Sequence, residues 1–139
     1  MTRTNTLFLP FCALLIATLA PAAATGQQVR IAELGMGTAA ADTYTALSTA
    51  VAGFDVVAAD SIRDPGVMEK VLGGLNEGWG AVVSRSGGFG FIFSERLELS
   101  KDLGTYPGKS LRANPPFGAQ FKVAGTRFVF NLVVCRRTT

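Results

Sequence analysis

The hydrophobic pattern of the chain changes near Trp79, from a helical period of about 3.6 residues to a period of two. Before Trp79, an apolar segment over 29–34 predicts a strand, and a helical pattern follows over 39–51 with Gly53 as its stop. The side chains expected on one face of this helix are Tyr44, Leu47, Ala50 and Val51. The apolar run 55–59 is typical of a strand covered on both faces.

A second helix is predicted to begin at Asp64-Pro65. Asp64 can cap the helix with its carboxylate, and proline is favoured at the first helical position. Apolar residues then recur with helical spacing at Val67, Met68, Val71, Leu72 and Leu75. This stripe indicates a helix that covers a sheet.

After Trp79 the pattern predicts strands joined mostly by tight turns. Two hairpins are expected, the first from 81–83 and 90–93 and the second from 117–123 and 127–135. A further short strand is predicted at 96–99, and the Gly- and Pro-rich segment 102–116 reads as a loop.

The order of elements predicts a single α/β domain with a mixed sheet of about five or six strands and two helices on one face. We see no internal repeat and no domain linker. The strand side chains expected to be buried on one face or the other are Val57, Val82, Phe91, Phe93, Phe121, Phe128, Phe130 and Val133.

Residues 1–24 have the pattern of a signal peptide. Arg3 gives a positive start, 7–20 is apolar apart from Thr18, and small residues over 20–24 offer cleavage sites. We therefore expect an exported domain over 25–139, periplasmic or secreted, with no transmembrane span after processing. Cys12 would leave with the signal. The alternative is a retained amino-terminal anchor.

The charge of the chain points to no particular partner. The 13 basic and 10 acidic residues give a formal charge of +3, and removal of Arg3 would leave 12 against 10. The basic residues are scattered, with Arg136-Arg137 as the only adjacent pair. Nucleic-acid binding is therefore not expected.

Cys135 would be the one cysteine of the mature chain, so no internal disulfide is expected. Because it ends an apolar strand, we interpret it as a small buried hydrophobic residue. Intermolecular pairing or a reactive thiol are the alternatives.

Gly35, Gly37 and Ala40 have the spacing of a dinucleotide-binding loop, and Asp60 could be its ribose-binding acid. The acid follows Gly35 by 25 residues, slightly more than usual, and the alternation of strands and helices ends at Trp79. We therefore interpret these glycines as a plain strand-to-helix turn without a cofactor.

Six stretches together carry a family resemblance: VRIA, FDVVAADSIRDPGVMEKVL, GWGAVVS, FIFSERLEL, YPGKSLRANPPFGAQF and TRFVFNLVV. In order and spacing, 29–135 resembles the amino-terminal half of the endonuclease/exonuclease/phosphatase superfamily, which includes deoxyribonuclease I-like nucleases. The resemblance implies half of a four-layer α/β sandwich, whose second sheet this chain would not encode. The uncovered sheet face would then associate with another copy or another protein.

The resemblance also implies metal-assisted hydrolysis of a phosphate ester, but the functional positions are substituted. The family's metal-binding Asn and Glu align with Gly35 and Ser61, and its Tyr-Arg pair aligns with Phe93 and the residue after it. A further Arg aligns with Asn114 and the His with Cys135, and the chain contains no histidine. The leading hypothesis is therefore an exported, non-catalytic half-domain that acts by association and needs no cofactor.

Two alternatives remain open. A metal site for Mg²⁺ or Mn²⁺ rebuilt from Glu33 and Asp60 would give a metal-dependent phosphodiesterase or nuclease. Cys135 is a weaker candidate nucleophile because no histidine is present to activate it. The other alternative is a truncated gene product without function.

Overall fold

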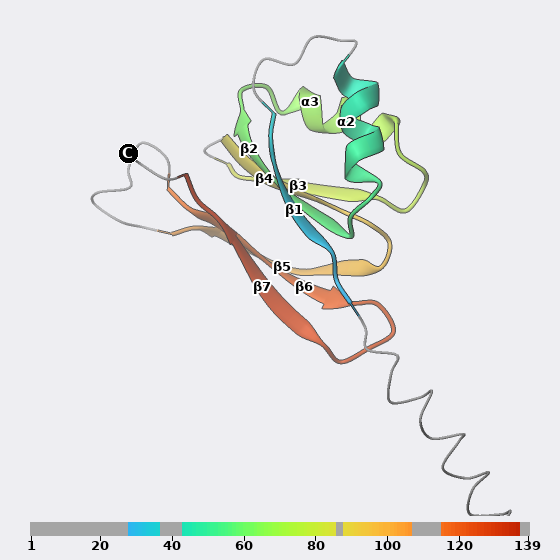
Figure 1. Ribbon diagram of the computed structural model, residues 1–139. Coiled ribbons are helices and arrows are strands. Elements are labelled where there is room, and N and C mark those ends of the chain that lie inside the picture. The colour runs from blue at the N-terminus through green and yellow to red at the C-terminus, as the bar shows by residue number, and fades with distance from the viewer. Residues whose placement is uncertain (1–27, 37–42, 86–87, 107–114, 137–139) are drawn as a thin grey trace, which may run out of the picture.

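The computed structural model describes residues 28–36, 43–85, 88–106 and 115–136 (Figure 1). The elements in chain order are β1 (Ile31–Gly35), α2 (Thr43–Val51), β2 (Val56–Ile62), α3 (Gly66–Gly73), β3 (Gly80–Val83), β4 (Gly88–Phe93), β5 (Leu97–Thr105), β6 (Phe117–Val123) and β7 (Val129–Val134). This order confirms the predicted succession of strand, helix, strand, helix and then strands.

The strands form two sheets. A four-stranded mixed sheet has the order β1-β2-β4-β3, in which β1 and β2 are parallel and the other pairs are antiparallel. A three-stranded antiparallel sheet has the order β5-β6-β7. The mixed α/β fold with two helices is confirmed, but the described strands number seven and divide between two sheets rather than one.

The two helices cover one face of the mixed sheet and the three-stranded sheet covers the other (Figure 1). The core under the helices contains Val51 from α2, Met68 from α3 and Ile92 from β4. The core between the sheets is aromatic, and the ring centroid of Phe91 lies 5.7 Å from those of both Phe117 and Phe121.

The expectation of an uncovered sheet face is therefore corrected. The alternating residues of β6 are buried against the mixed sheet, so this chain supplies a second sheet for the helix-free face. The physical reason is the period-two pattern of β6, which places a continuous apolar face toward Phe91 and Val56. The chain thus builds three layers, one of helices and two of strands.

Two of the predicted core residues are exposed. Phe128 is 58% exposed just before β7, and Val133 is 51% exposed because Phe130, Leu132 and Val134 take the inward positions of that strand. The burial of Val57, Phe91 and Phe121 is confirmed. Val82, Phe93 and Phe130 are partly buried against the core between the sheets.

α3 begins at Gly66, one residue after the predicted first helical position, and ends at Gly73, so Leu75 of the predicted stripe follows the helix. The predicted start signals are present next to this start. Asp64 Oδ1 accepts a hydrogen bond of 2.9 Å from the Gly66 backbone N–H, and Pro65 has helical φ and ψ of −56° and −27°. In α2, however, Ala50 is exposed and Ser48 is buried. Ser48 is tolerated there because its hydroxyl donates to the Val71 carbonyl of α3 at 2.8 Å.

The predicted loop over 102–116 is wrong in its first part. β5 continues to Thr105 through two register shifts, and Gly104 adopts a φ of +71° at the second. A glycine accepts this conformation without steric cost, so the polar sequence is compatible with a bulged edge strand.

Neither helix in the described parts of the chain is long and apolar enough to cross a membrane. The predicted signal peptide over 1–24 lies outside the described residues. Export therefore stays a prediction.

Candidate functional site

Three of the positions that the sequence resemblance singled out lie at one end of the two sheets. β1 and β2 are parallel, and their pairing ends with Gly35 opposite Asp60, two residues before the end of β2. β7 ends beside them, because a guanidinium nitrogen of Arg136 donates to Ser61 Oγ at 2.6 Å. We call Gly35, Asp60, Ser61, Cys135 and Arg136 the carboxyl-end cluster. Topology thus brings together residues that are up to a hundred positions apart in the sequence.

Gly35 offers no side chain to this cluster, and its neighbour Asp60 faces the vacated space. A Cβ atom built on Gly35 would lie 3.4 Å from Asp60 Oδ1, an ordinary contact distance. The Met36 N–H donates to the Asp60 carbonyl at 2.9 Å and continues the parallel pairing by one residue. An alanine methyl group would therefore fit at 35. Gly37 and Ala40 of the predicted turn lie outside the described residues.

Ser61 has an unusual backbone. Its φ of +56° is the only positive value for a residue other than glycine in the described segments. The cause is local, since the pairing of β2 with β4 shifts register between Ala59 and Ile62. Residues other than glycine are strained in this left-handed backbone region, by about 1 kcal/mol or more. Ser61 thus places a hydroxyl at an irregularity near the end of β2.

Cys135 is exposed, which corrects the interpretation of a buried thiol. Val134 is the last residue of β7 and is 4% exposed, so the alternation of the chain turns the next side chain away from the core. Hydrophobic neighbours in the sequence were therefore a misleading guide to its environment.

Glu33 and Asp60, the candidate metal ligands, lie on the same face of neighbouring strands. Asp60 pairs with Gly35, and Glu33 lies two residues before Gly35, so both side chains point to the helix-free face. No third aspartate, glutamate, histidine or cysteine joins them within the described residues. Two carboxylates can contribute to a Mg²⁺ site, but the remaining ligands would have to be water or substrate oxygens.

Phe93 does not join the cluster. It pairs with Val56 at the opposite end of β2, and its ring centroid lies 5.3 Å from that of Phe121 in the core between the sheets. Gly80 makes room for it, because a Cβ there would lie 2.7 Å from Phe93 Cζ. Phe93 is therefore a packing residue. Asn114, the remaining aligned position, lies outside the described residues.

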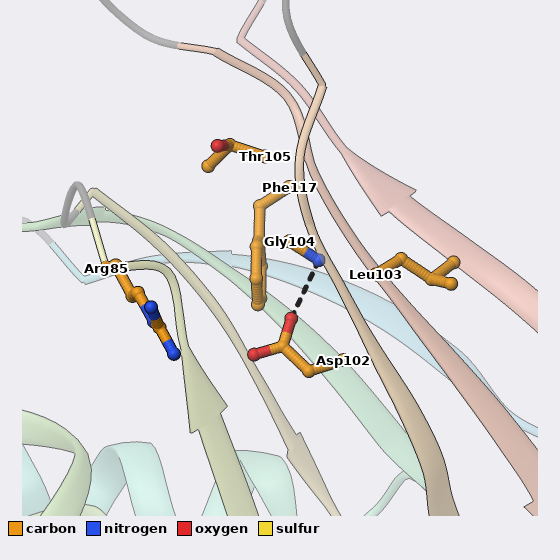
Figure 2. A pocket seen from close by; sticks show the side chains of 6 residues that line it. All are labelled: Arg85, Asp102, Leu103, Gly104, Thr105 and Phe117. Carbon is orange, nitrogen blue, oxygen red and sulfur yellow. Dashed lines mark hydrogen bonds between the residues drawn. The ribbon is translucent and has the colours of Figure 1, made fainter.

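A pocket that no local sequence pattern indicates opens between the sheets at the same end of the molecule (Figure 2). Its volume is about 350 Å³, and it is lined by Arg85, Asp102, Leu103, Gly104, Thr105 and Phe117. Asp102 Oδ1 accepts a hydrogen bond of 2.8 Å from the Gly104 N–H, so this carboxylate stabilises the bulge of β5. The local sequence of this segment predicts a loop, and only the pairing of β5 with β6 places it opposite Arg85.

Comparison with protein families, curated proteins and solved structures finds no match for this chain.

Proposed function

We propose that this chain is an exported, non-catalytic domain with a fold like that of the endonuclease/exonuclease/phosphatase superfamily, and that it acts by binding another polypeptide. The supporting observation is the carboxyl-end cluster, in which Gly35, Ser61 and Cys135 occupy one end of the sheets. The resemblance would place an Asn, a Glu and a His at these positions.

The chemistry of these substitutions argues against hydrolysis. Glycine has no ligand atom, and a serine hydroxyl is a poor ligand for a hard divalent cation. Loss of one preorganised charge-stabilising group typically lowers a rate by about 10²–10³. Losing the metal ligands and the proton-transferring His together would leave no useful rate enhancement.

Hydrolysis is tested with protein recovered after expression of the full chain. We expect no release of nitrophenol from bis(nitrophenyl) phosphate, and no nicking of supercoiled DNA, with Mg²⁺ or Mn²⁺. The matched control is the double variant Glu33→Gln, Asp60→Asn. Activity that depends on Mn²⁺ and disappears in the control would reject the proposal.

Association is tested separately by sedimentation of the tagged chain in an unfractionated extract of the cells that naturally produce it. We expect a complex well above the chain mass of 14.6 kDa. Sedimentation as a monomer would contradict association.

The second candidate function is a metal-dependent phosphodiesterase with a rebuilt site. It is favoured by the common face of Glu33 and Asp60 at the ends of β1 and β2. The nitrophenol assay above decides between the two proposals, because only this candidate predicts metal-dependent turnover that the double variant loses.

A further inference from the structure

The two sheets differ in width, and β1 extends beyond the smaller one. β7 lies nearest to β2, and β6 lies nearest to β4. β1 is the next strand outward from β2, on the same side of the molecule as the edge strand β7 (Figure 1). Ile31, Glu33 and Gly35 on its helix-free face are all exposed, with Ile31 at 50%, whereas Val56 of β2 on that face is 0% exposed. A strand position beneath β1 and beside β7 is therefore vacant within the described structure.

β7 lacks the features that normally protect an edge strand. Its sequence VFNLVV contains no charge, proline or glycine, and its pairing with β6 has no register shift. β5, at the other edge of the same sheet, has two register shifts and carries Glu98, Lys101 and Asp102. Bulges and charges prevent a further strand from pairing. The β5 edge is thus closed to strand addition, and the β7 edge is open to it.

The hydrogen-bonding groups of β7 alternate between β6 and the open edge. Val123 N–H donates to the Phe128 carbonyl at 3.0 Å, which fixes the bonded pairs of this antiparallel ladder. Phe130, Leu132 and Val134 therefore bond to β6. The N–H and C=O groups of Val129, Asn131 and Val133 point toward the open edge, where a further strand could pair with them.

Exposed apolar side chains collect beside this edge. Within the described residues, the large hydrophobic side chains that are exposed are Ile31, Phe54, Leu99, Tyr106, Phe128, Val129 and Val133. Four of these seven, Ile31, Phe128, Val129 and Val133, lie on β1, on β7 or just before it. Ile31 lies on the face of β1 above the vacant position, whereas Val129 and Val133 point to the outer face of the three-stranded sheet, because the alternate residues of β7 are turned inward. A strand added at this edge would therefore have exposed apolar neighbours on both of its faces.

We propose that the vacant strand position binds an extended segment of another protein, which adds to β7 as an antiparallel strand beneath β1. This inference rests on the proposed function, because it names the surface by which the domain associates. Backbone hydrogen bonds to Val129, Asn131 and Val133 would supply affinity, and alternate side chains would supply specificity.

The occupant is a single strand rather than a second copy of this domain. Suppose that the β7 strands of two copies paired across a twofold axis. The β1 strand of each copy would then lie over the β7 strand of the other copy, where that copy already has its own β2 strand. A segment without a sheet layer of its own avoids this clash.

The helix-free face of β1 above the vacant position, with the neighbouring end of β2, defines the side chains that the occupant needs. Ile31 is apolar, Glu33 is acidic, and Asp60 lies beside Gly35 on the same face. The segment would therefore place an apolar side chain against Ile31 and a basic side chain against the two carboxylates.

The probe is a blocked peptide of sequence Thr-Val-Thr-Lys-Thr-Val-Thr, labelled for fluorescence anisotropy and added to the protein recovered after full-chain expression. We expect saturable binding below about 1 mM. Replacing the lysine by glutamate, or N-methylating alternate amides, should weaken it at least tenfold. No saturation, or equal binding of the lysine and glutamate peptides, would overturn the inference.

Two variants of the protein test the same surface. Glu33→Lys changes an exposed side chain and should reverse the preference, so that the glutamate peptide binds at least tenfold more tightly than the lysine peptide. Val133→Pro removes an N–H that points to the open edge and should abolish binding. Leu99→Pro on β5 is the matched control and should bind as the unaltered chain does. An unchanged preference in Glu33→Lys would overturn the inference even if the proline variants misfold.

The inference and the proposed function can fail separately. If the complex in the cell extract persists while the peptide does not bind, association stands and the surface is wrong. If the chain sediments as a monomer in that extract, the proposed function fails whatever the peptide does. A purified dimer that Val133→Pro dissociates would overturn the choice of a single strand as the occupant.

Discussion

A guanidinium nitrogen of Arg96 lies 2.8 Å from Oδ1 of Asp55 and so connects the two sheets. Asp55 comes directly before β2, and Arg96 comes directly before β5. The Asp55 side chain is 3% exposed, and its other oxygen accepts a hydrogen bond of 2.7 Å from the Arg30 N–H. One carboxylate thus fixes the entries to β1, β2 and β5 at the end opposite the carboxyl-end cluster.

Asp55→Ala is expected to lower the free energy of unfolding by about 2–3 kcal/mol, because the partly buried Arg30 N–H and the Arg96 guanidinium that connects the sheets both lose their acceptor. The control is Arg30→Gln. The Arg30 guanidinium is 61% exposed and 4.0 Å from the Asp55 carboxylate, so its loss should cost less than about 0.5 kcal/mol. Urea denaturation measures the change in the free energy of unfolding for each variant. Equal and small changes would show that the Asp55 carboxylate does not stabilise the fold.

Ser61→Gly is expected to raise the free energy of unfolding by about 0.5–1 kcal/mol, since glycine adopts a φ of +56° without strain. Ser61→Ala retains the strain and loses the hydrogen bond from Arg136, so it separates the two contributions. In thermal denaturation, the Ser61→Gly variant should have a higher midpoint temperature than the unaltered protein and the Ser61→Ala variant. A destabilised Gly variant would mean that the hydroxyl matters more than the backbone.

Gly80→Ala is expected to destabilise the protein by about 1–3 kcal/mol, because the new methyl group would meet the ring of Phe93. Introduced into a Phe93→Ala background, the same change should cost almost nothing. Chemical denaturation of the double-mutant cycle measures this coupling. Additive costs would rule out a direct clash between these two positions.

Ser48→Ala is expected to cost about 1 kcal/mol, because it removes the buried hydrogen bond to the Val71 carbonyl of α3, which then accepts only from the Gly74 N–H. Thr49→Ala is a matched control, since Thr49 Oγ1 donates to the Thr45 carbonyl at 3.0 Å on the exposed side of the same helix. Its cost should stay below about 0.5 kcal/mol. The prediction fails if the two variants unfold at the same urea concentration.

Cys135 is expected to react in the native protein with a thiol–disulfide exchange reagent at a rate close to that of a model thiol, because its side chain is exposed. Cys135→Ser should remove this reaction and leave the free energy of unfolding within about 0.5 kcal/mol. Protection of the thiol until the protein is denatured would restore the interpretation of a buried residue.

The local signals of the sequence determined the elements and their order. The helix start at Asp64-Pro65, the run 55–59 and the hairpins after Trp79 all depend on neighbours within a few residues, and the structure confirms them. The aligned positions Gly35 and Ser61 could also be placed at strand ends, because parallel strands end at one edge of a sheet.

Only the tertiary structure decided how the strands divide between sheets and which side chains are exposed. A period of two shows that β6 and β7 each have an apolar face, but it does not show which sheet that face meets. Val133 and Cys135 follow apolar neighbours in the sequence yet are exposed, because the alternation of β7 turns them away from the mixed sheet, and Phe128 is exposed just before that strand. Burial depends on neighbours distant in the chain, which a local pattern does not contain.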